Sequence, residues 1–256
     1  MSSPTTFFEW VVFLLQQYHN SYLQGMLTTL ETSLTGTLPG CCLGFVVGLV
    51  QSVDLHRDMG AVKKVLLPIP RVICKIYVTV LRGTPMIVQA MVVFYGLAQG
   101  FGINIDSFQA AILVITLNTG AYMSETVRGG INSIDPGQVE GAQALGMNYI
   151  TMIAHIILPQ TFRIIAPQIG STFVANIKDT SELNVIAVTE LFYVTNAVAG
   201  TYYRMFEAFT ITAMIYLSLT LVFNFLLKLL ESHLAGSSSY EIIPAAQLVP
   251  AQENER

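Results

Sequence analysis

Charged side chains are scarce in this sequence. Asp, Glu, Lys and Arg together make up 11% of the 256 residues, whereas apolar residues make up 53%. A soluble domain usually carries about 25% charged residues. The composition therefore excludes an ordinary soluble domain and indicates a polytopic membrane protein. The net charge of −4 is mild and gives no indication of a nucleic-acid partner.

Cysteines and nucleotide-binding motifs are scarce as well. The chain has three cysteines, of which Cys41 and Cys42 are adjacent, so their spacing provides neither a disulfide framework nor a set of metal ligands. No GxxxxGK[ST] loop, the motif that holds nucleotide phosphates, occurs in the sequence. If the chain acts in an ATP-driven system, the ATPase must be a different chain.

Residues 1–25 are predicted to form a helix outside the membrane or at its surface. Residues 5–17 are apolar on one side but too short to span a bilayer, and Trp10 suits the membrane–water interface. The alternative is that this segment is the packed first half of the next helix. No Lys or Arg precedes Arg57, so the basic start of a signal peptide is missing and we expect no cleavage.

Five hydrophobic stretches are predicted to cross the membrane, each with about the 20 apolar residues that the hydrocarbon core requires. They lie at about 26–50, 85–101, 108–127, 165–194 and 207–229. In the first, Gly40, Gly44 and Gly48 recur every four residues, which allows close helix packing. The fourth is interrupted by charged residues at 178–182, so it is predicted to be a discontinuous helix facing protein or a water-filled cavity.

The distribution of Lys and Arg predicts the orientation of these spans. Most of these cations lie at 54–75 and 128–163, which marks both segments as cytoplasmic. In the first segment, Pro68 and Pro70 are predicted to break any continuous helix. Five spans then place the N-terminus outside and the C-terminus in the cytoplasm of an inner or plasma membrane protein that contacts lipid. The tail 231–256, rich in Ser, Ala, Pro and Glu, is predicted to be disordered and cytoplasmic.

The stretch EGAQALGMNYITMIAHIILP at 140–159 is too broken to cross the membrane. Asp135 and Pro136 precede it as a predicted helix N-cap and first helical residue. Its spacing of Glu, small, Ala, Gly and Ile-x-Leu-Pro resembles the cytoplasmic loop of ABC importer permeases, which forms coupling helices that dock on the ATPase. Gly141 stands where that family usually has Ala. Within this coupling loop, 135–160, the resemblance assigns ATPase coupling to Glu140, Gly141, Ala142, Gly146, Tyr149, Met152 and Ile156.

Two features of this coupling loop have structural interpretations. Gly146 is predicted to mark the kink between two coupling helices. Tyr149, Met152, Ile153 and Ile156 recur at helical spacing and form an apolar face. That face either fills a groove on the ATPase, which we favour, or packs beneath the membrane domain.

Further motifs extend the resemblance over about 25–230 to the polar amino-acid permeases, the membrane subunits of histidine-, glutamine- and arginine-type ABC importers. The motifs are RGTP at 82–85 with Gln89, AYMSETVRGGINSIDPGQ at 121–138, ILPQTFRIIAP at 157–167 and KDTSELNVIAVTEL at 178–191. The resemblance implies an all-α fold of the type I ABC importer permease class, with five transmembrane helices. It also implies three kinds of partner: a second permease, identical or homologous; a dimer of cytoplasmic ATPases that binds ATP and Mg²⁺; and an extracytoplasmic amino-acid-binding protein. The chain itself is expected to be no enzyme and to hold no metal or cofactor.

The interrupted fourth span carries the substrate hypothesis, because ionisable groups inside a span mark transport pathways. A helix restarting near Leu183 would offer N–H groups to a substrate carboxylate. Asp179 and Glu182 would neutralise an ammonium group and a cationic side chain, so arginine, lysine or histidine is favoured over glutamine. The commoner family pattern has an apolar residue where Glu182 stands. The alternatives are internal pairing with Lys178 or a break that lies nearer the membrane interface. The predicted substrate-binding residues are Lys178, Asp179, Thr180, Ser181, Glu182 and Asn184.

Three further charged residues flank the predicted spans. Glu125 and Arg128 are three apart and pair on one helix face, which makes them a structural tie. Arg82 stands at a span end, where such side chains reach toward the interface. A role in a gate or in direct substrate contact is the less favoured alternative for all three. The main rival to an ABC importer is an ion-coupled secondary transporter, which usually has internal repeats, and none is found here.

Overall fold

The computed structural model describes residues 4–52 and 68–234, and the regular structure in these ranges is entirely helical. The predicted all-α class is confirmed. The elements in chain order are α1 (Phe7–Ser52), α3 (Pro68–Arg82), α4 (Met86–Phe101), α5 (Ser107–Asn132), α6 (Pro136–Ala144), α7 (Tyr149–Met152), the π-helix η1 (Ile153–Ile157), α8 (Leu158–Asp179), the 3-10 helix η2 (Thr180–Ile186), α9 (Leu191–Tyr202) and α10 (Met205–Leu234).

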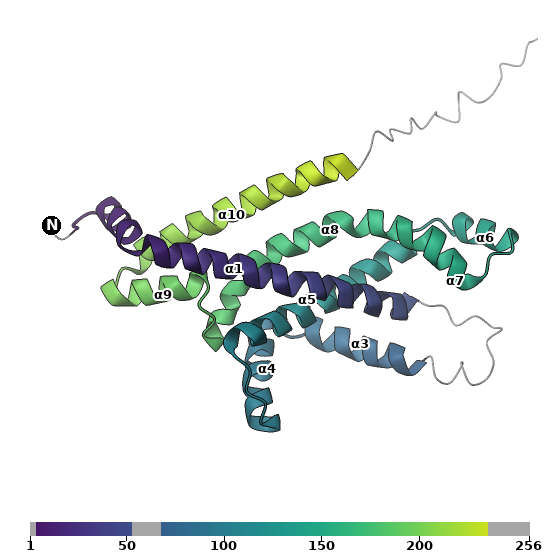
Figure 1. Ribbon diagram of the computed structural model, residues 1–256, viewed down its shortest axis with the longest axis horizontal. Helices are drawn as coiled ribbons and strands as arrows, with labels where there is room; N and C mark the ends of the chain where they lie inside the picture. The colour runs from purple at the N-terminus through teal and green to yellow at the C-terminus, as the bar shows by residue number, and fades with distance from the viewer. Residues whose placement is uncertain (1–3, 53–67, 235–256) are drawn as a thin grey trace, which may run out of the picture.

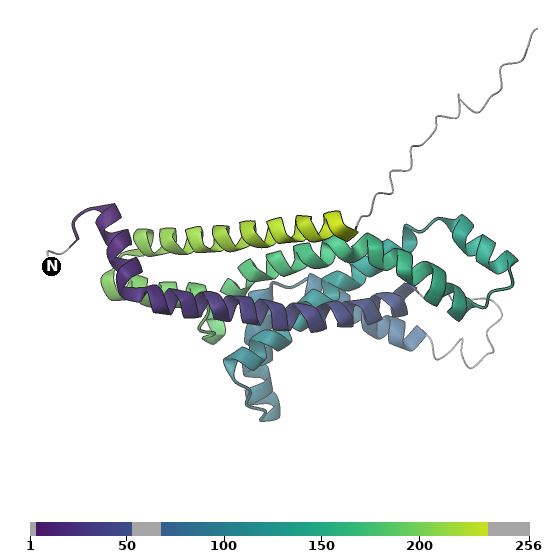
Figure 2. The same ribbon diagram turned by 45° about the horizontal axis from the view of Figure 1, so that its top comes forward.

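The long helices α1, α5, α8 and α10 run along one axis of an elongated bundle (Figure 1). Helix α5 lies at its centre and contacts α1, α3, α4 and α8. Helices α6 and α7 lie at one end, and α9 lies at the other beside the N-terminal part of α1 (Figures 1 and 2). Helix α4 projects sideways from the bundle (Figure 1).

Helices α1 and α5 approach each other along a row of glycines in α1. A Cβ atom added to Gly36, Gly40, Gly44 or Gly48 would lie 2.5–2.7 Å from atoms of α5. The α5 residues at these contacts also recur every four positions: Ile115, Thr119, Met123 and Val127. Glycine is therefore required for this approach, and the predicted close packing is confirmed.

The N-terminal segment is the first part of α1. The helix bends at Tyr18, whose φ of −119° and ψ of 16° are not helical. Before the bend, Leu14 is fully buried and the Trp10 ring lies 5.8 Å from that of Tyr202 in α9. The segment before the bend therefore packs on α9, and its predicted place at the membrane surface stays a prediction.

Helix α3 corrects the expectation that Pro68 and Pro70 break any continuous helix at 54–75, of which 54–67 lies outside the described residues. The helix begins at Pro68 and continues through Pro70. A proline in the first helical turn is tolerated because its missing N–H has no helical partner there. Helix α4 follows after a bend of 113°.

Among the described residues, three helical stretches are long and apolar enough to cross a membrane, namely Phe7–Ser52, Tyr149–Ile186 and Met205–Ser232. The bent pair of α3 and α4 adds a fourth if it counts as one span. Helix α5 has 26 residues and is about 39 Å long, but it carries Asn118, Glu125 and Arg128. The count of five spans stays a prediction. Residues 231–234 of the predicted disordered tail, 231–256, continue α10, and the rest of the tail lies outside the described residues.

Candidate functional site

The apolar stretch that begins with α8 is interrupted where the charged residues predicted it. Helix α8 ends at Asp179, η2 follows, and Ala187 adopts a left-handed conformation with φ of 60°. The helix restarts at Leu191, so the expected restart near Leu183 is wrong. The reason is Glu190, whose carboxylate accepts hydrogen bonds from the N–H groups of Phe192 (2.9 Å) and Tyr193 (2.7 Å) and so begins α9.

The predicted substrate-binding residues lie together along the end of α8 and η2. Lys178 and Asp179 are exposed, and Ser181, Glu182 and Asn184 are partly exposed. Thr180 is buried, and its hydroxyl donates to the Ile177 carbonyl at 2.9 Å. Within the described residues, Lys178 forms no ion pair with either neighbouring carboxylate, so the alternative of an internal pair is wrong.

The two carboxylates of this stretch differ in their contacts. Glu182 accepts a hydrogen bond from the N–H of Ile87 at 2.8 Å, in the first turn of α4. Asp179 has no hydrogen-bond or ion-pair partner within residues 4–52 and 68–234. Of the two carboxylates, that of Asp179 is therefore the one without a hydrogen bond among the described residues.

The bend between α3 and α4 is held by Gln89, which is 7% exposed. Its side-chain amide donates to the carbonyls of Leu81 (2.8 Å) and Thr84 (2.9 Å). Its Oε1 accepts from the side-chain amide of Asn118 in α5 at 3.0 Å. Gln89 therefore satisfies the carbonyls of the bend and links the bend to α5.

Arg82, Glu125 and Arg128 form one cluster beside this bend. Arg128 pairs with Glu125 at 2.7 Å, which confirms the predicted tie within α5. Arg82, the last residue of α3, lies 3.7 Å from the same Glu125 oxygen, and its guanidinium lies 5.4 Å from the centre of the Tyr122 ring. The link between Arg82 and Glu125 joins α3 to α5 and was not predicted from the sequence.

The role of Glu190 is a second feature that was not predicted from the sequence. This residue is 0% exposed and accepts from the hydroxyl of Tyr216 at 2.8 Å and that of Thr29 at 3.4 Å. It therefore joins α9 to α1 and α10. The signal was present, because Glu190 is the only charged residue between Glu182 and Arg204.

The predicted coupling loop contains two short helices separated by a turn at Gly146. Gly146 has φ of 75°. Its N–H donates to the Gln143 carbonyl, and the N–H of Met147 donates to the Ala142 carbonyl, which is the Schellman pattern. The Asn148 side chain then caps α7 by accepting from the Thr151 N–H at 2.9 Å. The predicted kink at Gly146 and the predicted cap at Asp135, which accepts from the Gly137 N–H, are both confirmed.

The apolar face of this loop packs inward. Met152 is 2% exposed and Ala142 is 3% exposed, in one cluster with Ile134 and Ile157. Partly buried residues around the cluster include Tyr149, Ile153 and Ile156. The structure therefore favours packing beneath the membrane domain over docking for this face. Leu145 (83% exposed) and Ile150 (79% exposed) are the large apolar side chains that point outward, while Glu140, Gly141 and Gly146 are also exposed.

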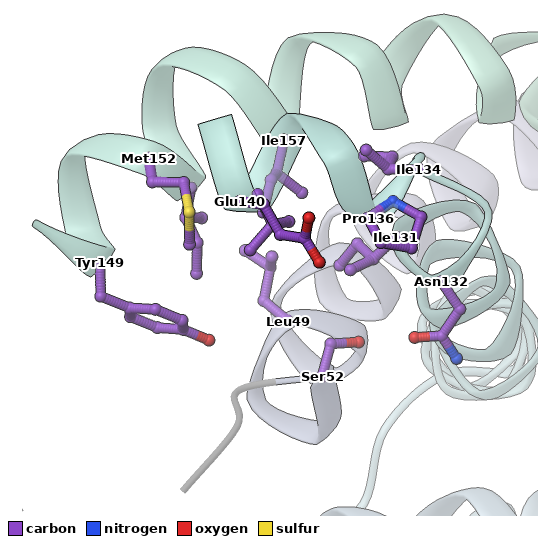
Figure 3. Close-up of a pocket in the computed structure, with 12 residues that line it drawn as sticks. Leu49, Ser52, Ile131, Asn132, Ile134, Pro136, Glu140, Tyr149, Met152 and Ile157 are labelled. Atoms are coloured by element: carbon purple, nitrogen blue, oxygen red, sulfur yellow. The ribbon is translucent and has the colours of Figure 1, made fainter. Parts of the chain in front are cut away.

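A cavity of about 480 Å³ lies beneath the loop, between the ends of α1 and α5 (Figure 3). Glu140, Tyr149 and Met152 line it from the loop, together with Leu49 and Ser52 from α1. The remaining lining is mainly apolar. The loop and the ends of α1 and α5 thus enclose this cavity between them.

The comparisons with known proteins agree with this arrangement. Residues 64–236 match the family described as binding-protein-dependent transport system inner membrane component. The chain belongs to this family. It is 34% identical over 215 residues to the arginine transport system permease protein ArtQ of Bacillus subtilis (strain 168), covering 84% of this chain and 93% of that protein. It is 33% identical over 210 residues to the glutamine transport system permease protein GlnP of Escherichia coli (strain K12), covering 82% and 90%.

A solved structure has the same architecture as this permease. The crystal structure of an amino acid ABC transporter with histidines superposes with a TM-score of 0.77 at 29% sequence identity. The match covers 90% of this chain and 100% of that chain. The fold is therefore that of a type I ABC importer permease.

Proposed function

We propose that this permease is the membrane subunit of an ATP-driven importer for polar, cationic L-amino acids. It would form the translocation path with a second permease subunit. A dimer of separate ATPases, with their ATP and Mg²⁺, would dock at the end of the bundle that carries α6 and α7. An extracytoplasmic binding protein would deliver the amino acid at the opposite end, and both the N-terminus and α9 would lie outside.

One observation supports the cationic substrate most directly. A helix break lies inside the apolar stretch Tyr149–Ile186 and carries an exposed carboxylate, Asp179, that has no partner among the described residues. Ionisable groups at such a position are energetically costly, and their presence indicates a role in transport. The similarity to an arginine permease is in accord with a positively charged side chain, whereas the similarity to a glutamine permease leaves an uncharged one as the competing substrate.

The substrate carboxylate needs donors other than the N–H groups that were expected from a helix restarting near Leu183. The first three N–H groups of α9 are already bonded: those of Phe192 and Tyr193 to Glu190, and that of Leu191 to Thr29. Lys178, Ser181 and Asn184 remain as donors on the break, and the three are at least partly exposed. Glu182 uses Oε2 for Ile87, which leaves Oε1 for a cation.

Uptake by the assembled complex in proteoliposomes tests this proposal. A hydrogen bond to a charged group contributes about 1.5–3 kcal/mol. Asp179→Asn is therefore expected to weaken arginine binding by roughly ten- to a hundred-fold while glutamine is less affected. Glu182→Gln is also expected to reduce uptake of the cation, and Glu182→Leu, the commoner family pattern, should favour uncharged amino acids.

The same preparation separates an ABC importer from an ion-coupled transporter. Uptake should require ATP inside the vesicles and a co-purified ATPase. Uptake that follows an ion gradient without ATP would contradict the proposal. Arginine uptake at the wild-type rate and affinity in Asp179→Asn and in both Glu182 variants would remove the cationic assignment.

A further inference from the structure

Two interruptions of the helical bundle meet at one place. The bend between α3 and α4 and the break between α8 and α9 are far apart in the sequence, but α4 contacts η2. Met86 and Ala90 of α4 lie in one buried cluster with Leu183 and Ile186 of η2. The two irregular segments therefore pack directly on each other.

Helix α4 packs mainly on two elements of the bundle, α5 and η2. It contacts α5 and η2, with Met86, Ala90, Val93 and Phe94 in or against the shared buried cluster, and projects from the bundle (Figure 1). Toward its other end, Val92 is 65% exposed and Phe101 is 77% exposed. The packing of α4 is therefore concentrated between Met86 and Phe94, in its N-terminal half.

Polar contacts reach that end from two sides. On one side, Gln89 bonds to Asn118 of α5. On the other, Glu182 accepts from the N–H of Ile87, a donor that has no partner within its own helix because it lies in the first turn. A carboxylate at this position also interacts favourably with the positive end of the helix dipole.

We propose that Glu182 is a positioning residue that joins η2 to the N-terminus of α4, so that both interruptions move as one unit during transport. Burial of Leu183 and Ile186 is favourable but not directional. The hydrogen bond that Ile87 donates to Glu182 depends on distance and angle, so it determines how the two segments are aligned. The consequence for transport rests on the proposed function. The hydrogen bond between Ile87 and Glu182, which we call the joint, does not depend on the proposed function, because both residues belong to this chain.

The distance between α4 and η2 tests the joint in the complete complex. Spin labels are placed at Val92 in α4 and at Thr189, an exposed residue beyond η2, after the free cysteines Cys41, Cys42 and Cys74 have been replaced. The wild type should give one narrow distance that is the same with and without ATP. Glu182→Leu should lose the single narrow distance, because Leu cannot accept the bond. Glu182→Gln should keep it, because its side-chain oxygen still accepts from Ile87.

Two further variants make the result decisive. Asp179→Leu, at the neighbouring carboxylate that forms no hydrogen bond or ion pair with the described residues of α4, should keep the narrow distance. Replacement of the amide at residue 87 by an ester removes the donor and leaves Glu182 unchanged, so it should reproduce the loss seen in Glu182→Leu. A narrow distance that persists in the ester variant would overturn the proposal, even if Glu182→Leu fails to assemble. Failure of arginine uptake alone would contradict the proposed substrate and leave the distances as they are.

Discussion

The side chain of Gln89 donates to the carbonyl of Leu81 at 2.8 Å, the position that the N–H of residue 85 would occupy in a continuous helix. Residue 85 is a proline and has no N–H to give. A carbonyl left unpaired in a membrane protein is costly, because no water is available to replace the bond. Gln89 thus supplies from a side chain the donor that Pro85 removes, which explains why the two residues occur together in the bend.

Gln89→Met is expected to destabilise the protein. The change leaves the Leu81 and Thr84 carbonyls without this donor and the Asn118 amide without its acceptor, and each such buried group costs about 1–3 kcal/mol. We expect a loss of at least about 2 kcal/mol in the free energy of unfolding, measured by denaturant unfolding in detergent. Gln99→Met, the same change at an exposed position of α4, is the matched control. Equal stability of the two variants would contradict the role of Gln89.

Gly146→Val is expected to uncouple the ATPase. A β-branched residue at φ of 75° costs about 1–2 kcal/mol of backbone strain and disturbs the angle between α6 and α7. ATP hydrolysis stimulated by the binding protein should fall sharply, while Gly146→Asn, which tolerates this conformation, should retain it. Gly100→Val, in α4 and outside the loop, adds the same bulk where no atom lies within 4 Å and should have little effect. Equal rates for the Val and Asn variants at 146 would exclude this explanation.

The outward residues of the coupling loop should carry the contact with the ATPase. Leu145→Ser combined with Ile150→Ser should reduce the amount of ATPase that co-purifies, with little change in the unfolding temperature, because both side chains are exposed. Met152→Ala should have the opposite profile, with a loss of about 2–5 kcal/mol in stability, because Met152 is buried. Full recovery of ATPase with the double variant would mean that docking uses another surface.

Glu190→Ala should destabilise the end of the bundle that carries α9. The variant leaves the N–H groups of Phe192 and Tyr193 and the hydroxyl of Tyr216 without their common acceptor. Loss of a helix cap together with hydrogen bonds to a charged group costs about 2 kcal/mol or more. The unfolding temperature of the purified protein measures this loss. Glu31→Ala, at an exposed carboxylate of α1, should match the wild type, and a similar loss in both would argue against a specific role of Glu190.

Accessibility of single cysteines should establish the orientation. In a background without Cys41, Cys42 and Cys74, Asn132→Cys at the end of α5 should react only with reagents on the cytoplasmic side. Thr201→Cys, exposed near the end of α9, should react only from outside. The expected sides follow from the excess of Lys and Arg in the segments 54–75 and 128–163. Labelling of residue 132 from outside would reverse the orientation.

The sequence alone predicted the structural features that depend on residues close together in the chain. The glycines spaced by four, the kink at Gly146, the pair of Glu125 and Arg128 and the interruption after Lys178 each depend on residues within one or two helical turns. Propensity, capping and side-chain spacing determine such features before any packing occurs. The family resemblance was also carried by short ordered motifs.

Tertiary structure alone decided which groups meet. The partner of Glu182 is Ile87, 95 positions away, and that of Gln89 is Asn118 on the next helix. Helical periodicity identified the face that contains Met152 but not what covers it, because an apolar stripe has the same pattern whether it faces its own bundle or a partner. Glu190 begins α9 in place of a residue near Leu183, because a buried carboxylate becomes favourable only when Thr29 and Tyr216 from distant helices supply its donors.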